Sequence, residues 1–177
     1  LKTMRQNKIN STTGSEIVST SDLKLYARID TTADDTLIAR MLVQARIWCE
    51  NYISKDIVAK NRTYYIDESK SGMFDLPFAP VSSITSVHVD NVATTDFTVL
   101  GLDKETIELD NGPANNIKVV YVTSGIDNNL LQQAILQLAA TYYDHRSDIF
   151  DGNSKIGVVE IPTSVKNILS SYRSMFI

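Results

Sequence analysis

Three closely spaced aspartates, Asp30, Asp34 and Asp35, form the tightest group of side chains that could do chemistry. Neighbouring carboxylates can bind a divalent cation, but an EF-hand loop needs liganding oxygens at alternate positions and a glycine at its sixth position. This segment has neither feature. Because the helix dipole favours negative charge at a helix start, we interpret these residues as part of a turn and a first helical turn.

His145 is a second candidate, because Asp144, Arg146 and Asp148 are its neighbours. A histidine oriented by a carboxylate can act as a general base, but it then needs a partnered nucleophile. The adjacent Ser147 has no catalytic motif around it. Histidine and arginine are favoured at helix C-termini, so this group is typical of a polar helix end.

The remaining reactive residue types give no site. Cys49 is the one cysteine, which excludes an internal disulfide, and it falls on the apolar face of a predicted helix, where it would serve packing. Two histidines and one cysteine cannot supply an ordinary structural zinc site. Gly152 is solitary and lacks the Lys-Ser or Lys-Thr of a phosphate loop. We therefore predict a protein that is not an enzyme and has no cofactor or metal. The alternative is a hydrolase or metal-dependent enzyme that uses the three aspartates or His145.

Length and composition are those of a globular domain. The chain has 177 residues, of which 43% are hydrophobic and 21% are charged. A net charge of -4 argues against a general nucleic-acid binder, because such proteins neutralise phosphates. The sequence has no apolar run long enough to span a membrane and no apolar region typical of a signal peptide near its start. It begins with leucine, which leaves its native first residue open.

The elements that would position these residues are organised around a helix predicted over 127–146, with Asp127 as its N-cap. No charged residue occurs from Asn128 to Tyr143, and apolar side chains cover most of the helix circumference. Such a helix is usually covered on more than one side. It is therefore either a central core helix or a helix whose second face meets another subunit.

Three further helices are predicted. A capping box of Ser19 and Asp22 starts a short helix that ends near Arg28 and buries Leu23, Tyr26 and Ala27. A second helix covers 32–53, and its apolar side includes Trp48 and Tyr52. Its polar side, which includes Glu50, also carries Val43 and Ile47 one turn apart, a spacing that suggests a contact. Pro162 opens the last helix, which ends in the apolar residues Met175, Phe176 and Ile177 and so favours docking of the C-terminal end.

Between the second helix and the 127–146 helix the hydrophobic period changes from helical to alternating. Five strands are predicted there, over 63–66, 84–89, 97–100, 106–109 and 117–122. The predicted fold class is α+β: a helical bundle of about four helices with an inserted small antiparallel β module. The predicted organisation is a flexible N-terminal arm (1–19), the helical domain (20–60 and 125–177) and the β module (61–124).

The long segment that follows the 127–146 helix is polar at first and then apolar at Ile156, Val158 and Val159. A linker of this length inside a compact domain is often functional. Its second half could pair as an edge strand, either within the subunit or with a neighbouring one.

The order of several short motifs resembles the tailed-phage head–tail connector family, also called head-completion or adaptor proteins. The motifs are Leu23-Lys24, Arg28-Ile29-Asp30, Asp34-Asp35, Leu37-Ile38, Ala45, Glu50, Leu76-Pro77, Pro80-Val81, Ser83-Ile84, Ser86-Val87, Tyr121, Gly125, Tyr142-Tyr143, Arg146, Ile161-Pro162, Leu169 and Tyr172-Arg173. The resemblance covers about residues 20–175. The chain departs from the family pattern in lacking the usual proline near Gly125 and in having a longer loop after Arg146.

The resemblance implies a structural virion protein that is assembled in the host cytoplasm. It also implies a homo-oligomeric ring, commonly of twelve subunits, that sits beneath the portal protein at the head–tail interface. Such a ring joins the capsid to neck and tail-completion proteins and lets double-stranded DNA pass without sequence-specific binding. Another neck component, such as a stopper or tail-completion protein, is the alternative within this class. No membrane partner is implied.

These inferences together select a set of candidate residues for contact with the portal or with a neighbouring subunit. They are Val43, Ile47, Arg146, Ile156, Val158, Val159, Tyr172, Arg173, Met175, Phe176 and Ile177. For Arg146 and Arg173 we expect ion pairs or carbonyl contacts near helix ends, or else solvated cations.

Overall fold

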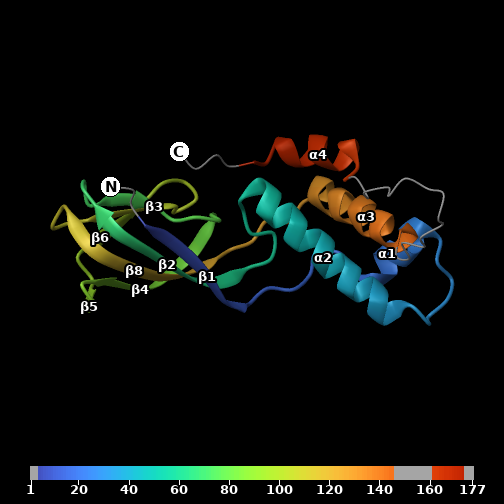
Figure 1. Ribbon diagram of the computed structural model, residues 1–177, viewed down its shortest axis with the longest axis horizontal. Helices are drawn as coiled ribbons and strands as arrows, with labels where there is room; N and C mark the ends of the chain where they lie inside the picture. Colours follow the sequence, from blue (N-terminus) through green and yellow to red (C-terminus); the bar gives the residue numbers. More distant parts are fainter. Residues whose placement is uncertain (1–3, 146–160, 174–177) are drawn as a thin grey trace, which may run out of the picture. The chain divides into compact units, whose positions relative to one another are not determined.

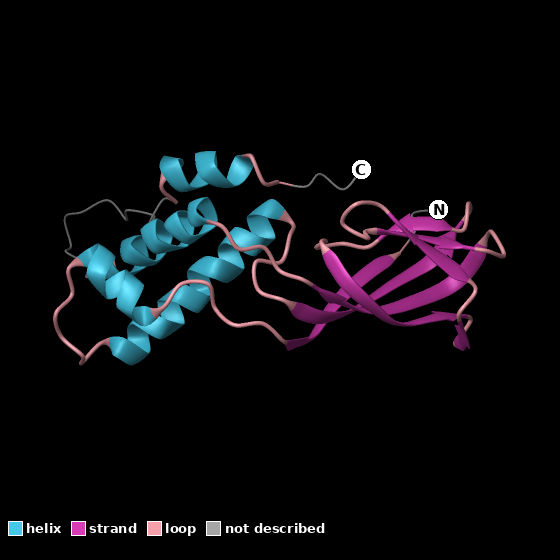
Figure 2. Cartoon of the chain, turned by 180° about the vertical axis from the view of Figure 1, so that it is seen from behind, coloured by secondary structure: helices cyan, strands magenta, loops and turns pink. Residues whose placement is uncertain are grey.

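A computed structural model describes residues 4–145 and 161–173. Contacts divide these residues into a β unit, which holds the residues up to Ser15 and Ser54–Ile126, and a helical unit, which holds Glu16–Ile53 and the residues from Asp127 onward. Among the described residues, the β unit contains the strands and the helical unit contains the helices (Figures 1 and 2). The predicted α+β class is confirmed.

The β unit contains two antiparallel sheets. Its strands are β1 (Arg5–Thr12), β2 (Lys60–Ser69), β3 (Met73–Asp75), β4 (Val81–Val89), β5 (Val92–Thr94), β6 (Phe97–Leu100), β7 (Thr106–Leu109) and β8 (Ala114–Thr123). One sheet has the order β1-β2-β8-β4-β5, and the other has the order β3-β7-β6. All five predicted strands are present, with β2, β4 and β8 longer than expected. Strands β1, β3 and β5 were not predicted from the sequence.

The two sheets share one apolar core. Alternate residues of β2 and β8, among them Tyr64, Ile66, Ile117 and Val119, pack in it with Ile107 of β7. The core also holds Tyr121, whose hydroxyl is directed to Pro77 and donates to its carbonyl oxygen at 2.6 Å. Alternation with a period of two is what produces this one-sided burial.

The N-terminal residues differ from the predicted flexible arm, because Arg5–Thr12 form β1 and pair with β2. The strand is exposed along its whole length, so it lacks the alternating apolar residues from which a strand is predicted. It is held by backbone pairing and by amide side chains. Asn7 donates to the Tyr121 hydroxyl at 3.2 Å, and Asn10 donates to Asn61 at 2.7 Å.

A buried ion cluster ties the β unit together. Asp56 is fully buried and accepts hydrogen bonds from Lys60 (2.9 Å), Arg62 (2.7 and 2.8 Å) and the Thr123 hydroxyl (2.8 Å). Burial alone would raise the pKa of Asp56, but Arg62 and Lys60 together outweigh it, so the pKa lies below that of an ordinary aspartate. The carboxylate is therefore charged at neutral pH.

The helical unit consists of α1 (Thr20–Ala27), α2 (Asp35–Ile53), α3 (Asn129–Asp144) and α4 (Thr163–Ser170), and α3 contacts the other three. The apolar spacing of α3 predicts a buried face of Leu131, Ala134, Ile135, Leu138 and Tyr142. The first four are buried, whereas Tyr142 is half-buried. Figure 1 shows α3 beside α2, as the contacts between them require.

The ends of the helices are only partly as predicted. The capping box of Ser19 and Asp22 is confirmed. The predicted cap of α3 is wrong: Asn128, not Asp127, accepts from the Leu131 amide, because Asp127 bonds the side chain of Gln132 instead. Helix α4 ends at Ser170, before the predicted end at residue 177, and residues 174–177 lie outside the described part of the chain.

Two sequence-based expectations of burial are wrong in the helical unit. Tyr26 was expected in the core but is 45% exposed, whereas Glu50 was placed on the polar side of α2 and is 3% exposed. Glu50 is buried because it bonds Arg46 at 2.7 Å, and Arg46 also bonds Glu16 at 2.8 Å. Burial alone would lower the pKa of Arg46, but the two carboxylates raise it, so the guanidinium stays charged.

We predict that Asp56→Asn lowers the free energy of unfolding by about 3–5 kcal/mol at neutral pH, because it removes the negative charge that the buried guanidinium of Arg62 pairs with. Chemical denaturation measures this loss. The exposed Asp103→Asn serves as the matched control, with an expected change within about 0.5 kcal/mol.

The contribution of Asp56 to the free energy of unfolding should decrease as the pH falls. The folded-state pKa of Asp56 is lowered, so its contribution to stability is present above the ordinary pKa of an aspartate, about 4, and is lost as the pH falls from there through the lower pKa of the folded state. Below about pH 4, the free energy of unfolding of Asp56→Asn should therefore fall less steeply with decreasing pH than that of the wild type. Equal losses for both aspartate variants would contradict a stabilising role for the cluster.

Candidate functional site

The predicted interface residues that the structure describes lie at two places in the helical unit. Tyr172 and Arg173 follow α4, whereas Val43 and Ile47 lie on α2. Arg146, Ile156, Val158, Val159, Met175, Phe176 and Ile177 lie outside the described residues. The structure therefore brings the described candidates into two pairs and leaves the other predictions open.

The end of α4 is attached to α3. Val165 and Leu169 of α4 are fully buried, and the Ser164 hydroxyl donates to the side-chain oxygen of Gln137 at 2.9 Å. The Tyr172 hydroxyl lies 3.3 Å from Asn128 Oδ1, the same atom that caps α3. The chain beyond α4 thus leaves from a fixed point at the start of α3.

Arg173 contacts an aromatic pair on α2. Its guanidinium carbon lies 5.6 Å from the centre of the Tyr52 ring, and Tyr52 stacks on Trp48 with a centroid distance of 5.2 Å and an interplanar angle of 18°. This is a cation–π contact. It differs from the expected ion pair or carbonyl contact of Arg173, because the side chain meets the face of an aromatic ring.

Trp48 and Tyr52 were assigned from the sequence to the apolar face of α2. Their stacking into an aromatic platform that Arg173 contacts was not predicted. Both are half-buried. Their spacing of four residues was a usable signal, since residues four apart are neighbours on a helix surface. The partner, Arg173, is distant in the sequence, and no local pattern links it to them.

Val43 and Ile47 occupy the outer side of α2 to different degrees. Ile47 is 44% exposed and Val43 is half-buried. Other helices of this unit also expose apolar side chains, with Leu25 of α1 83% exposed and Leu130 of α3 52% exposed. The described surface of the helical unit therefore carries several apolar side chains that its own core does not use.

The residues considered for chemistry have structural contacts. Asp34 accepts a hydrogen bond from the Tyr143 hydroxyl at 2.6 Å, and Asp35 pairs with Lys24 at 2.8 Å. His145 follows α3, and its Nδ1 lies 2.9 Å from the Thr141 carbonyl oxygen. These contacts fit the turn and helix-end interpretations of the sequence.

Cys49 is fully buried, as its position on the apolar face of α2 predicted. Burial, with a smaller contribution from Glu50, raises the pKa of its thiol to about 12. Among the described residues no group of three or more His, Cys, Asp or Glu side chains could hold a metal ion. No helix in the same residues is long and apolar enough to cross a membrane.

A model of the family named head completion protein matches residues 16–175, which is nearly the whole chain. The chain belongs to the head completion protein family. This confirms the resemblance drawn from the short motifs of the sequence. No protein of established annotation matches the chain.

Solved structures share the fold of this head completion protein. A chain from "Neck of empty GTA particle computed with C6 symmetry" is 18% identical, with a TM-score of 0.73 and 97% of each chain covered. A chain from "Virion of native gene transfer agent (GTA) particle" is 16% identical, with a TM-score of 0.69 and coverage of 97% of this chain and 96% of that one. A chain from "Neck of native GTA particle computed with C12 symmetry" is 17% identical, with a TM-score of 0.62 and coverage of 94% and 97%.

We predict that Tyr52→Leu lowers the free energy of unfolding by about 1–2 kcal/mol, because it removes both the stacking on Trp48 and the contact with Arg173. Hydrogen exchange of residues 163–173 should increase at the same time. Trp48 is the one tryptophan of the chain, so its fluorescence reports the unfolding directly.

Tyr26→Leu is the control for this prediction. Tyr26 is an exposed tyrosine of the same unit, and its replacement should change the free energy of unfolding by no more than about 0.5 kcal/mol. Equal effects of the two substitutions, or unchanged exchange in residues 163–173, would show that the platform does not hold the end of α4.

Proposed function

We propose that this protein is a head–tail connector, an adaptor that forms a homo-oligomeric ring beneath the portal protein. The observation that carries the proposal is the match to the head completion protein family over residues 16–175. The fold shared with chains of gene transfer agent necks supports the same role. In this role the protein is a structural component of the virion at the head–tail interface, is assembled in the host cytoplasm and joins the capsid to neck and tail-completion proteins.

The charge of the chain suits a ring through which double-stranded DNA passes. With a net charge of -4, the protein has no overall attraction for phosphates. Like charges repel at short range, so an acidic lumen would let DNA move without being clamped. We propose passage without sequence-specific binding.

Contacts between subunits would use the exposed apolar side chains of the helical unit. Ile47 and its neighbour Val43 on α2 are candidates, with Leu25 and Leu130 on the adjoining helices. Burying such a side chain contributes about 1.5–3 kcal/mol. The loop 147–161, which includes Ile156, Val158 and Val159, would reach a neighbouring subunit together with Arg146.

The portal contact would come from the C-terminal residues. Tyr172 and Arg173 are attached to α3 and α2, so the residues that follow start from a defined position on the helical unit. Met175, Phe176 and Ile177 are three apolar side chains in succession. An apolar segment that leaves a rigid base suits insertion into a groove of a partner protein.

Deletion of residues 174–177 should weaken binding to the cognate portal protein by about a hundredfold or more, because it removes three apolar side chains from the contact. It keeps Tyr172 and Arg173, so the thermal unfolding of the isolated chain should stay unchanged. Surface plasmon resonance with immobilised portal measures the affinity.

The control is Met175→Leu combined with Phe176→Leu, which preserves apolar area and should bind nearly as the wild type does. Unchanged affinity of the truncated chain for portal would show that another surface makes the contact. Binding to a connector or a tail protein, but not to portal, would instead assign the protein as a stopper or tail-completion protein.

A further inference from the structure

Strand β1 carries an unbalanced positive charge at one edge of the five-stranded sheet. Arg5 and Lys8 are exposed, and neither forms an ion pair with any described residue. The first acidic residue after them is Glu16. The same stretch exposes apolar side chains, since Met4 and Ile9 are each 49% exposed.

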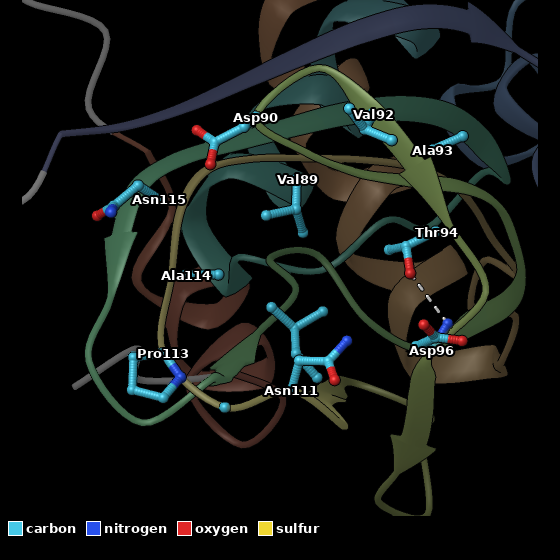
Figure 3. A pocket seen from close by; sticks show the side chains of 12 residues that line it. Val89, Asp90, Val92, Ala93, Thr94, Asp96, Asn111, Pro113, Ala114 and Asn115 are labelled. Atoms are coloured by element: carbon cyan, nitrogen blue, oxygen red, sulfur yellow. Dashed lines mark hydrogen bonds between the residues drawn. The ribbon is translucent and has the colours of Figure 1, made fainter.

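The opposite edge of this sheet borders an open hollow of about 420 Å³ (Figure 3). The hollow lies between the β4–β5 hairpin and the turn from β7 to β8. Its apolar lining consists of Val89, Val92, Ala93, Leu109, Pro113 and Ala114. Val92 is 69% exposed, so part of this apolar lining faces solvent.

Two carboxylates stand at this hollow, and the described residues that line it include no cation. Asp90 lies in the two-residue turn between β4 and β5 and accepts a hydrogen bond from Asn116 at 2.8 Å. Asp96 follows β5, and its backbone N–H donates to Thr94 Oγ1 at 3.1 Å, the contact drawn in Figure 3. Both aspartates are exposed, so they form an acidic rim around an apolar surface.

Arg5 and Lys8 of β1 cannot form ion pairs with Asp90 and Asp96 of the same copy. They lie at the two edges of a sheet with the order β1-β2-β8-β4-β5. Four strand spacings separate the edges by about 19 Å, which is beyond the reach of an arginine or lysine side chain that must approach to within 4 Å. Complementary surfaces on opposite sides of one chain are what a head-to-tail contact needs, and such a contact closes into a ring when its rotation closes.

We infer that β1 of one copy docks against the hollow and acidic rim of the next copy, an inference that rests on the proposed ring. Arg5 and Lys8 pair with Asp90 and Asp96 of that copy, and Met4 or Ile9 covers its exposed apolar lining. The occupant of the hollow is thus a second copy of this chain.

The twist of the sheet decides what kind of contact this is. Adjacent strands rotate by about 20° each, so β1 and β5 differ in direction by about 80°. Neighbouring copies of a large ring differ only by a small rotation, so β1 crosses the next copy's β5 and does not extend its sheet. The contact therefore consists of side chains, and salt should weaken it, because exposed ion pairs are screened.

Charge exchange tests this contact in the full chain assembled with its cognate portal protein. One variant carries Arg5→Glu and Lys8→Glu. The other carries Asp90→Asn and Asp96→Lys. The asparagine introduced at position 90 keeps an oxygen for Asn116 and tolerates the positive φ of 49° there. Each variant should raise the concentration needed for ring assembly by about tenfold, since several exposed charge pairs are lost or reversed.

The chain that carries all four substitutions should assemble at a lower concentration than either double variant. Asp96→Lys again places a positive charge opposite the glutamates introduced in β1, and Asp90→Asn leaves no carboxylate there to repel them. Lys104→Glu combined with Lys166→Glu changes the net charge as much as the β1 variant does, at exposed positions outside β1 and the hollow, and should leave assembly unchanged. Mass photometry measures assembly, and thermal melting confirms that each variant is folded.

Unchanged assembly of both double variants, or failure of the fourfold variant to recover, would overturn the docking of β1 while leaving the proposed function intact. A wild-type chain that forms no ring with portal would overturn the proposed function, and the docking with it.

Discussion

The β unit depends on the buried carboxylate of Asp56. This one side chain joins the segment after α2 to β2, through Lys60 and Arg62, and to β8, through Thr123. Arg62 extends the link, because it also bonds Asn7 of β1 and lies 3.8 Å from the centre of the Phe78 ring. A buried charge is costly unless it is paired and fully hydrogen-bonded, and here every contact supplies an opposite charge or a donor. The cluster thus stabilises the five-stranded sheet, whose two edges carry β1 and the hollow beside β5.

The places where the chain passes between the two units are also fixed by backbone contacts in the β unit. The Gly14 N–H donates to the Ala59 carbonyl at 3.0 Å, and the Ile126 N–H donates to the Ile57 carbonyl at 3.0 Å. Gly125 has a φ of 74°, and a Cβ there would lie 2.7 Å from the Ile57 carbonyl oxygen, so this position favours glycine. In the helical unit the Arg46 cluster plays the corresponding part, since it binds Glu16 at the entry to α1 and Glu50 within α2.

Periodicity predicted what is local: the α+β class, the helices, and five strands, whose alternating residues form the core. It did not predict β1, because that strand is polar and the residues of β2 that pair with it lie 48 to 61 positions away in the sequence. It also placed Glu50 on the surface, since single-sequence reasoning treats a charged residue as solvated. The spacing of Arg46 and Glu50 was a signal for their pairing, but burial of Asp56 depends on residues of three separate segments. The hollow beside β5 lies between the β4–β5 turn and the β7–β8 turn, which are close only in the folded chain. No sequence pattern could therefore predict it.

The proposed function depends on four surfaces. They are a basic strand and an acidic hollow on the β unit, and exposed apolar side chains and the end of α4 on the helical unit. Assembly into a ring on the portal is the central claim. Electron microscopy of the full chain mixed with its cognate portal protein tests it most directly. If the protein is a connector, the images should show particles with a closed ring of this protein at one end of the portal, in rotational register with it. Portal particles without added density, while the chain remains monomeric, would contradict this role.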